Sequence, residues 1–182
     1  TCVVFVGDGR SNVANSLRVV GALLGMTVRV VAPRSMPGSA EVHEIVHRIC
    51  LRTGACVGET DDLESGVSGA DFVYADTWVR LGEPVESWRA RVAQLRPYRI
   101  DGAVLTATAN PGVRFLHCLP AVHDNSTSVG AAVLAETGLM GAEVSNEVFH
   151  SSASLVFQQA ENRMHAIKAL LVTDLTGGVP CW

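Results

Sequence analysis

Short apolar runs alternate with helix-like apolar spacings along the first two thirds of the chain. Five runs predict buried strands, at residues 2–7, 27–33, 55–59, 70–76 and 113–120. The intervening segments predict helices, one with an apolar stripe at Val13, Leu17, Val20 and Leu24 that stops at Gly25, and others at 39–53, 62–67, 86–95 and 101–108. Strands separated by helical crossovers form parallel sheets. The pattern therefore predicts an α/β fold: an open parallel sheet of about five strands with helices on both faces, in a Rossmann-like three-layer arrangement.

The two ends of the chain have patterns of their own. Residues from about 153 to 175 predict a helix with Met164, Ile167, Leu171 and Leu175 on one stripe. The first residues, TCVVFVGDG, are already an apolar run and lack an initiator methionine. Because a domain rarely begins inside its first strand, we expect a further segment before Thr1.

Composition narrows the class of protein. The chain has 182 residues, of which 48% are apolar and 18% charged, as in a globular domain. Its net charge of -4 argues against nucleic acid or an anionic membrane as the main partner. No apolar run is long enough to span a bilayer. Five cysteines without a C-x-x-C pair indicate thiols of a reducing compartment, so we expect a cytoplasmic protein.

Reactive and polar side chains follow several of the predicted strands. Asp8 and Asn12 follow the first strand, Asp76 ends the fourth, and His117 and Cys118 lie in the fifth. Open parallel sheets bind ligands at the carboxyl ends of their strands, near the point where strand order reverses. These five residues therefore predict a ligand site at that edge.

Residues 42–50, VHEIVHRIC, match the H-E-x-x-H pattern in which two histidines bind zinc. Helix geometry places His43 and His47 on a flank beside the apolar stripe, on a helix remote from the strand ends. The longer metzincin pattern also fails, because Cys50 stands where glycine is required. We therefore interpret the pattern as a solvated helix flank and expect no metal site.

The segment GDGRSN resembles a dinucleotide-binding turn only in part. Gly7 and Gly9 are present, but Asn12 stands where the third glycine belongs. The second strand ends in Ala32 and Pro33, with no acidic residue to bind a ribose hydroxyl. Nicotinamide binding is therefore not expected. The segment is either a tight turn between strand and helix or a place where Asn12, at the helix start, contacts a small ligand.

Two further segments carry candidate chemistry. In FLHCLPAVHD, Cys118 is a candidate ligand contact, but His117 is not simply its base, because neighbours on a strand point to opposite faces. In YADTWVRLGEP, Asp76 suits an amine, Arg80 suits a carboxylate or phosphate, and Trp78 and Leu81 are candidate pocket walls. A surface loop with ordinary charges is the alternative for this second segment.

Taken together, these segments resemble the carboxy-terminal, amino-acid-binding half of the ornithine carbamoyltransferases, within the aspartate/ornithine carbamoyltransferase family. GDGRSNVANS, DTWVRLGEP, HCLPAVHD, EVSNEVF and QQAENRMHAIKALLV occur in that family's order and spacing. The resemblance covers essentially the whole chain. It implies transfer of a carbamoyl group from carbamoyl phosphate to the side-chain amine of ornithine, giving citrulline and phosphate, without a metal or organic cofactor.

The resemblance also implies roles for individual residues. Asn12 would hold the α-carboxylate or α-amino end of ornithine, and Asp76 its α-amino group. Cys118 and the backbone of Leu119 would lie at the reacting centre, and Arg163 would bind the carbonyl oxygen of carbamoyl phosphate. The implied set is catalytic Cys118 and Arg163, and substrate-binding Asn12, Asp76, Arg80, Leu81, His117 and Leu119. Residues 1–158 would form the amino-acid-binding domain, and 159–176 a helix that packs on a carbamoyl-phosphate-binding domain.

Two departures from the family pattern leave alternatives open. The family's Ser-Met-Gly loop reads Arg80-Leu81-Gly82 here, which adds a charge beside the amino-acid end. A different amine substrate, or a non-catalytic amino-acid-binding relative, is therefore an alternative to ornithine. The family's phosphate-binding half, with its Ser-x-Arg-Thr loop, is absent from these residues. We therefore expect the 182-residue chain alone to be inactive, and its parent enzyme to be a homotrimer by analogy.

Overall fold

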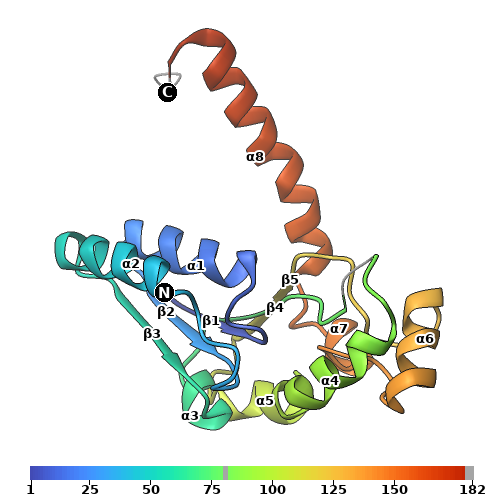
Figure 1. Cartoon of the computed structure of the whole chain (residues 1–182). Helices are drawn as coiled ribbons and strands as arrows, with labels where there is room; N and C mark the ends of the chain where they lie inside the picture. The colour runs from blue at the N-terminus through green and yellow to red at the C-terminus, as the bar shows by residue number, and fades with distance from the viewer. Residues whose placement is uncertain (80–81, 179–182) are drawn as a thin grey trace.

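A computed structural model describes residues 1–79 and 82–178 of the chain. Its centre is one five-stranded sheet, entirely parallel, with strand order β3-β2-β1-β4-β5 (Figure 1). The strands are β1 (Cys2–Val6), β2 (Thr27–Val31), β3 (Cys56–Thr60), β4 (Phe72–Ala75) and β5 (Arg114–His117). All five predicted strands are present, each shorter than or offset from its predicted range by one to three residues at either end.

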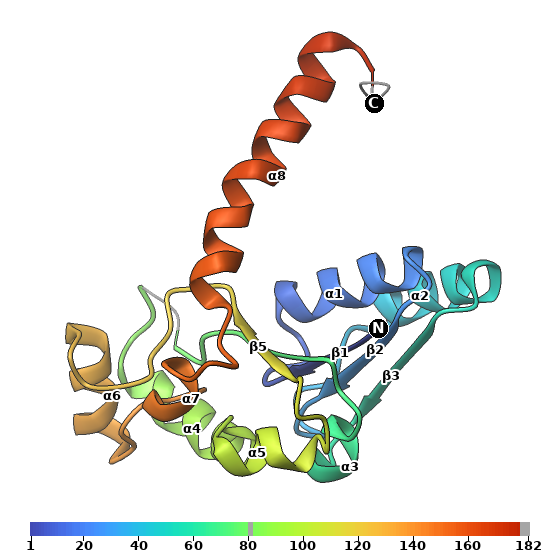
Figure 2. The same ribbon diagram turned by 180° about the vertical axis from the view of Figure 1, so that it is seen from behind.

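Helices cover both faces of the sheet, as Figures 1 and 2 show from opposite sides. Helices α1 (Asn12–Leu23) and α2 (Ala40–Thr53) lie on one face, and α3 (Leu63–Val67), α4 (Glu86–Leu95) and α5 (Gly102–Ala107) lie towards the other. The predicted three-layer α/β fold is therefore confirmed. Its main core is formed by valines of β1 and β4 packed with Phe115 of β5 and Ile100.

The apolar stripe predicted for the first helix is only half correct: Val13 and Leu17 pack on the core around Phe5, but the second half of the stripe does not. Val20 and Leu24 are 51% and 67% exposed, whereas Ala14, Arg18, Gly21 and Ala22 form the buried face of α1. Small residues face the sheet because the helix lies very close to β2: a Cβ at Gly21 would stand 2.2 Å from Cγ2 of Val28. Apolar spacing alone did not reveal that small residues and a buried arginine form the contact face.

Three helical segments were not predicted. They are α6 (Ser128–Thr137), α7 (Asn146–Phe149) and a short 3-10 helix at Arg96–Tyr98. Helices α4 and α6 enclose a second, smaller core around Trp78 and Trp88. This core anchors the segment that follows β4, because Trp78 itself belongs to that segment.

The last helix, α8 (Val156–Thr176), extends away from the body as a single arm (Figures 1 and 2). Its predicted stripe is exposed: Met164 and Ile167 are about half exposed, and Leu175 is 83% exposed. Within residues 1–79 and 82–178, no helix has the length and apolar character needed to cross a membrane.

Candidate functional site

The polar residues predicted to meet at one sheet edge follow the carboxyl ends of β1, β4 and β5. The chain passes from β1 to β2 and β3 on one side and returns to β4 on the other, so strand order reverses between β1 and β4. Asp8 follows β1, Asp76 follows β4, and Cys118 follows β5. Two cavities open at this edge, and Asp76 and Cys118 lie at the place where they approach each other.

Asp76 and Cys118 are in direct contact. The Cys118 thiol donates a hydrogen bond to Oδ1 of Asp76, with Sγ and Oδ1 2.9 Å apart, and the Thr77 amide donates to the same oxygen. Burial raises the pKa of the Cys118 thiol to about 12, and the hydrogen bond to Asp76 and the charge of that carboxylate add to the effect. Cys118 is therefore a protonated donor at neutral pH rather than a thiolate nucleophile.

His117 points away from Cys118, as strand alternation predicts. Its Nδ1 accepts a hydrogen bond from the Leu119 amide, and its Nε2 lies 3.3 Å from Oε1 of Glu143. The side chains of His117 and Glu143 are fully buried. His117 therefore holds the segment that follows β5 in place instead of acting as a base for Cys118.

Glu143 joins two segments of the site, and the sequence analysis did not identify it. Its carboxylate accepts from the backbone amides of Val122, at 2.6 Å, and Trp78, at 3.4 Å, besides facing His117. Trp78 follows β4 and Val122 follows β5, so one buried carboxylate fixes both segments. The only sequence signal was an acidic residue between the apolar neighbours Ala142 and Val144.

The first cavity, of about 470 Å³, lies between the ends of β1 and β4. Asn12 and Asp76 both line it, as does Trp78, one of the predicted pocket walls. Asp8 forms a two-point ion pair with Arg10 at 2.8 Å on the same rim. The cavity thus offers an amide and a carboxylate, the groups suited to the two charged ends of an amino acid.

The second cavity, of about 310 Å³, lies between the ends of β4 and β5 and the start of α8. Cys118 and Arg163 line it, together with Tyr74 and Gln159, which the sequence analysis missed. Burial raises the pKa of Tyr74 to about 12, although the hydrogen bond from Gln159 lowers it. The two predicted catalytic residues therefore border one cavity, 45 residues apart in the chain.

Arg80 and Leu81, both predicted substrate contacts, lie outside the described residues. The residues on either side of them are held by Arg91 of α4. Its guanidinium donates to Trp78 O at 3.1 Å and to both carboxylate oxygens of Glu83, at 2.6 and 3.0 Å.

Leu119, whose backbone was predicted at the reacting centre, directly follows Cys118 at this edge of the sheet. It has a positive φ of 50° and its peptide bond to Pro120 is cis. Its amide is committed to His117, at 2.9 Å. The Leu119 side chain packs against the main core.

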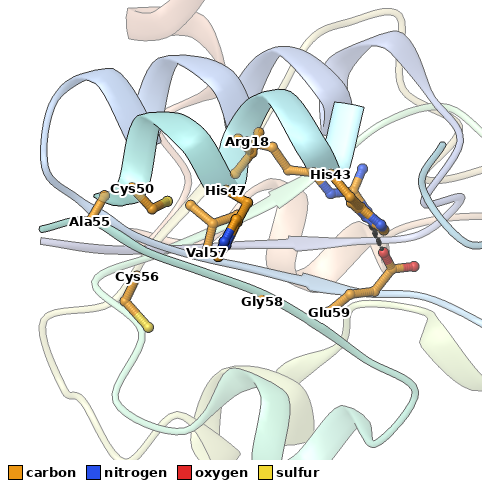
Figure 3. A pocket seen from close by; sticks show the side chains of 10 residues that line it. Arg18, His43, His47, Cys50, Ala55, Cys56, Val57, Gly58 and Glu59 are labelled. Atoms are coloured by element: carbon orange, nitrogen blue, oxygen red, sulfur yellow. Dashed lines mark hydrogen bonds and ion pairs between the residues drawn. The ribbon is translucent and has the colours of Figure 1, made fainter. Parts of the chain in front are cut away.

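The H-E-x-x-H histidines lie far from these cavities, on α2 above β3 (Figure 3). His43 does not simply face water as interpreted from the sequence, because its Nε2 lies 3.1 Å from Oε2 of Glu59. The same carboxylate accepts from the buried guanidinium of Arg18 at 2.8 Å. Among the described residues, no three His, Cys, Asp or Glu side chains gather closely enough to hold a metal ion.

Comparison with known proteins places this geometry in a family. Residues 1–173 match the family model "Aspartate/ornithine carbamoyltransferase, Asp/Orn binding domain". A Rhizobium meliloti protein named catabolic ornithine carbamoyltransferase is 45% identical over 172 residues, which are 94% of this chain and 52% of that protein. An ornithine carbamoyltransferase of Actinobacillus pleuropneumoniae is 43% identical over 174 residues, with the same coverage of both chains.

A solved structure supports the same family assignment. The ornithine carbamoyltransferase from Pyrococcus furiosus superposes with a TM-score of 0.78 at 32% identity, over 94% of this chain and 48% of that chain. The chain thus spans about half the length of the relatives it matches.

Proposed function

We propose, because the chain belongs to the aspartate/ornithine carbamoyltransferase family as an Asp/Orn-binding domain, that it is the ornithine-binding half of an ornithine carbamoyltransferase. The complete enzyme transfers the carbamoyl group of carbamoyl phosphate to the δ-amine of ornithine, giving citrulline and phosphate. The relatives with 43–45% identity carry the name ornithine carbamoyltransferase.

One observation carries the proposal. The Cys118 thiol contacts Asp76 at 2.9 Å while Arg163 borders the same cavity as Cys118. Asp76 also borders the cavity that contains Asn12. A single extended substrate therefore has a route from an amino-acid-binding cavity to a cavity with a cationic group, past Asp76 and Cys118.

The chemistry assigns a role to each group. The δ-amine must lose a proton before it attacks, because its pKa resembles that of lysine, about 10.4. Its nitrogen then bonds to the carbonyl carbon while the bond from that carbon to the phosphate oxygen breaks. The phosphate leaves with the bonding electrons and takes up the proton that the nitrogen loses. Arg163 stabilises the negative charge that develops on the carbonyl oxygen. Cys118, as a neutral thiol beside Asp76, orients the amine, and Asn12 and Asp76 hold the α-carboxylate and α-amino group.

A partner domain completes this arrangement. Residues 1–158 form the amino-acid-binding domain, and the exposed stripe of α8, within 159–176, packs on a carbamoyl-phosphate-binding domain. The complete enzyme is a homotrimer that acts in arginine metabolism in the cytoplasm. The 182-residue chain alone binds ornithine weakly and does not form citrulline.

The test is citrulline formation by the complete enzyme against a panel of amines, with Arg80→Ser measured beside it. We expect ornithine to be the best substrate, and Arg80→Ser to lower its KM. Turnover of another amine while ornithine remains inert contradicts the substrate. Turnover by the 182-residue chain alone contradicts the need for a second domain.

A further inference from the structure

Arg163 stands on an arm whose position depends on a single turn of helix. Every residue of α8 from Ala160 to Val172 is exposed, and the helix leaves the body beyond that turn (Figure 2). The side chain of Arg163 makes no hydrogen bond or ion pair with any other described residue. Its place beside Cys118 is therefore set by whatever fixes the start of α8.

Gln159 makes the only side-chain hydrogen bonds that join α8 to the described residues before it in the chain. Its Oε1 accepts from the His117 backbone amide at 3.1 Å, and its Nε2 donates to the Tyr74 hydroxyl at 2.7 Å. Backbone hydrogen bonds also hold the segment before α8 on β5, from Phe115 N to Ala153 O at 2.8 Å and from Leu155 N to Phe115 O at 2.9 Å. Within α8 itself the other ties are apolar: Val156 is buried, and Phe157 lies edge-on to Phe149 with ring centres 5.8 Å apart. Apolar packing alone leaves rotation about a helix axis weakly defined, whereas two directional hydrogen bonds define it.

The partners of Gln159 connect it to the site on both sides. Tyr74 lies two residues before Asp76, and the His117 amide lies one residue before Cys118. Arg163 follows Gln159 by four residues, so both side chains lie on one face of α8, about 6 Å apart along its axis. One amide group thus ties β4 and β5, whose ends lead directly into Asp76 and Cys118, to the helix that carries Arg163.

We propose that Gln159 is a positioning residue for carbamoyl transfer: its amide fixes the first turn of α8 on β4 and β5 and thereby sets Arg163 beside Cys118. This inference rests on the proposed function. Gln159 need not touch either substrate, because its effect passes through Arg163.

The experiment compares Gln159→Leu with Gln158→Leu in the complete enzyme, in which this chain is joined to its carbamoyl-phosphate-binding half. Gln158 is the matched control, because it is exposed and makes no hydrogen bond with its side chain in the described structure. Misplacement by about 1 Å costs roughly 100-fold, so we expect Gln159→Leu to lower kcat by about 10- to 100-fold. The KM for ornithine changes by less than about twofold, since Asn12 and Asp76 are untouched.

A second arm separates positioning from a merely structural role. In an Arg163→Ala background, Gln159→Leu is expected to lower kcat by less than about twofold further, because the group that it positions is already gone. The Gln159→Glu variant keeps two acceptors for the His117 amide and the Tyr74 hydroxyl, and is expected to retain most of the native kcat. If Gln159→Leu does not fold, Tyr74→Phe removes one of the two bonds and provides the same comparison.

Each outcome decides between the two proposals. Unchanged kcat in Gln159→Leu, an equal loss in Gln158→Leu, or the full loss persisting in the Arg163→Ala background overturns the positioning role while leaving the carbamoyltransferase proposal intact. Absence of citrulline formation by the native complete enzyme overturns the proposed function, and the positioning role with it.

Discussion

Two of the carboxylate–histidine pairs in the described structure have sharply different surroundings. His117 and Glu143 lie 3.3 Å apart with both side chains fully buried. His43 and Glu59 lie 3.1 Å apart, but with 44% and 21% of their side chains exposed. A similar pair of groups therefore serves two purposes: the buried pair holds the segments that carry the site, and the exposed pair lies at the mouth of a surface cavity.

The difference shows that burial, more than the identity or the number of the partners, separates the two pairs. Glu143 serves two backbone amides besides His117, none of which has water as an alternative partner. Glu59 also has several partners, namely the guanidinium of Arg18, Nε2 of His43 and the Gly38 amide, but 21% of its side chain is exposed to water. Buried groups that lose a partner pay a large desolvation penalty, whereas exposed ones are rescued by water.

The largest effect is expected from Glu143→Ala. The change leaves the amides of Trp78 and Val122 buried without an acceptor and removes the carboxylate that faces His117. It should lower the free energy of unfolding by about 3–5 kcal/mol. Urea denaturation followed by circular dichroism measures it. Glu143→Gln keeps one acceptor oxygen and should lose clearly less. A loss below about 1 kcal/mol for Glu143→Ala would show that the buried pair does not hold these segments.

Arg18→Met should come next, with a loss of about 2–3 kcal/mol in the free energy of unfolding. It leaves the Gly9 carbonyl, at 2.8 Å from the guanidinium, and the Glu59 carboxylate without their donor. The control is Arg34→Met, which breaks an exposed ion pair with Asp61 and should leave the unfolding midpoint unchanged. Equal effects of the two changes would contradict the view that burial separates these arginines.

The rate at which the Cys118 thiol is alkylated tests whether it is held in its protonated form. Because the folded pKa of about 12 lies above the free-thiol value of 9.0, the protonated thiol contributes stability that is fully present below pH 9 and is lost as the pH rises towards 12. At pH 8.5, iodoacetamide should therefore modify Cys118 several-fold more slowly than the exposed Cys56. Asp76→Asn removes two causes of the raised pKa and should speed Cys118 modification several-fold.

Mass spectrometry of peptides from the folded protein gives both alkylation rates. Cys56 serves as the internal control, since Asp76→Asn should not change its rate. A Cys118 rate equal to that of Cys56 would contradict a protonated, buried thiol.

The smallest effect is expected at the exposed pair. His43→Ala should change the free energy of unfolding by about 0.5 kcal/mol, because Glu59 keeps Arg18 and gains water. Denaturation under the conditions used for Glu143→Ala measures it. Zinc analysis of the purified native protein should give no stoichiometric metal; bound zinc that is lost in His47→Ala would instead revive the metal interpretation of H-E-x-x-H.

The pattern of the sequence predicted the layers and all five strands because a parallel sheet buried on both faces needs continuous apolar runs. It failed at α1, where Gly21 and Arg18 face the sheet, because close packing and a buried ion pair do not show in apolar spacing. It also failed at α6 and α7, whose boundaries depend on capping by Thr127 and Ser145 more than on an apolar stripe.

For the site, the sequence predicted that Asp76 and Cys118 meet at the carboxyl edge, and they are in hydrogen-bond contact. It also predicted that His117 turns away from Cys118, which follows from alternation along a strand. It did not reveal Glu143, Tyr74 or Gln159, because each acts through a contact with a residue at least 20 positions away.

What the sequence determined by itself is the order of elements, the parallel sheet and the edge where chemistry gathers, because these depend on local periodicity and on strand direction. The tertiary structure alone decided which groups are paired. Burial keeps the Cys118 thiol protonated beside Asp76 and gives Glu143 three partners, whereas His43 lies at the surface. The reason is physical: the free energy of a polar group depends on the water and partners around it, and these are known only once the chain has packed.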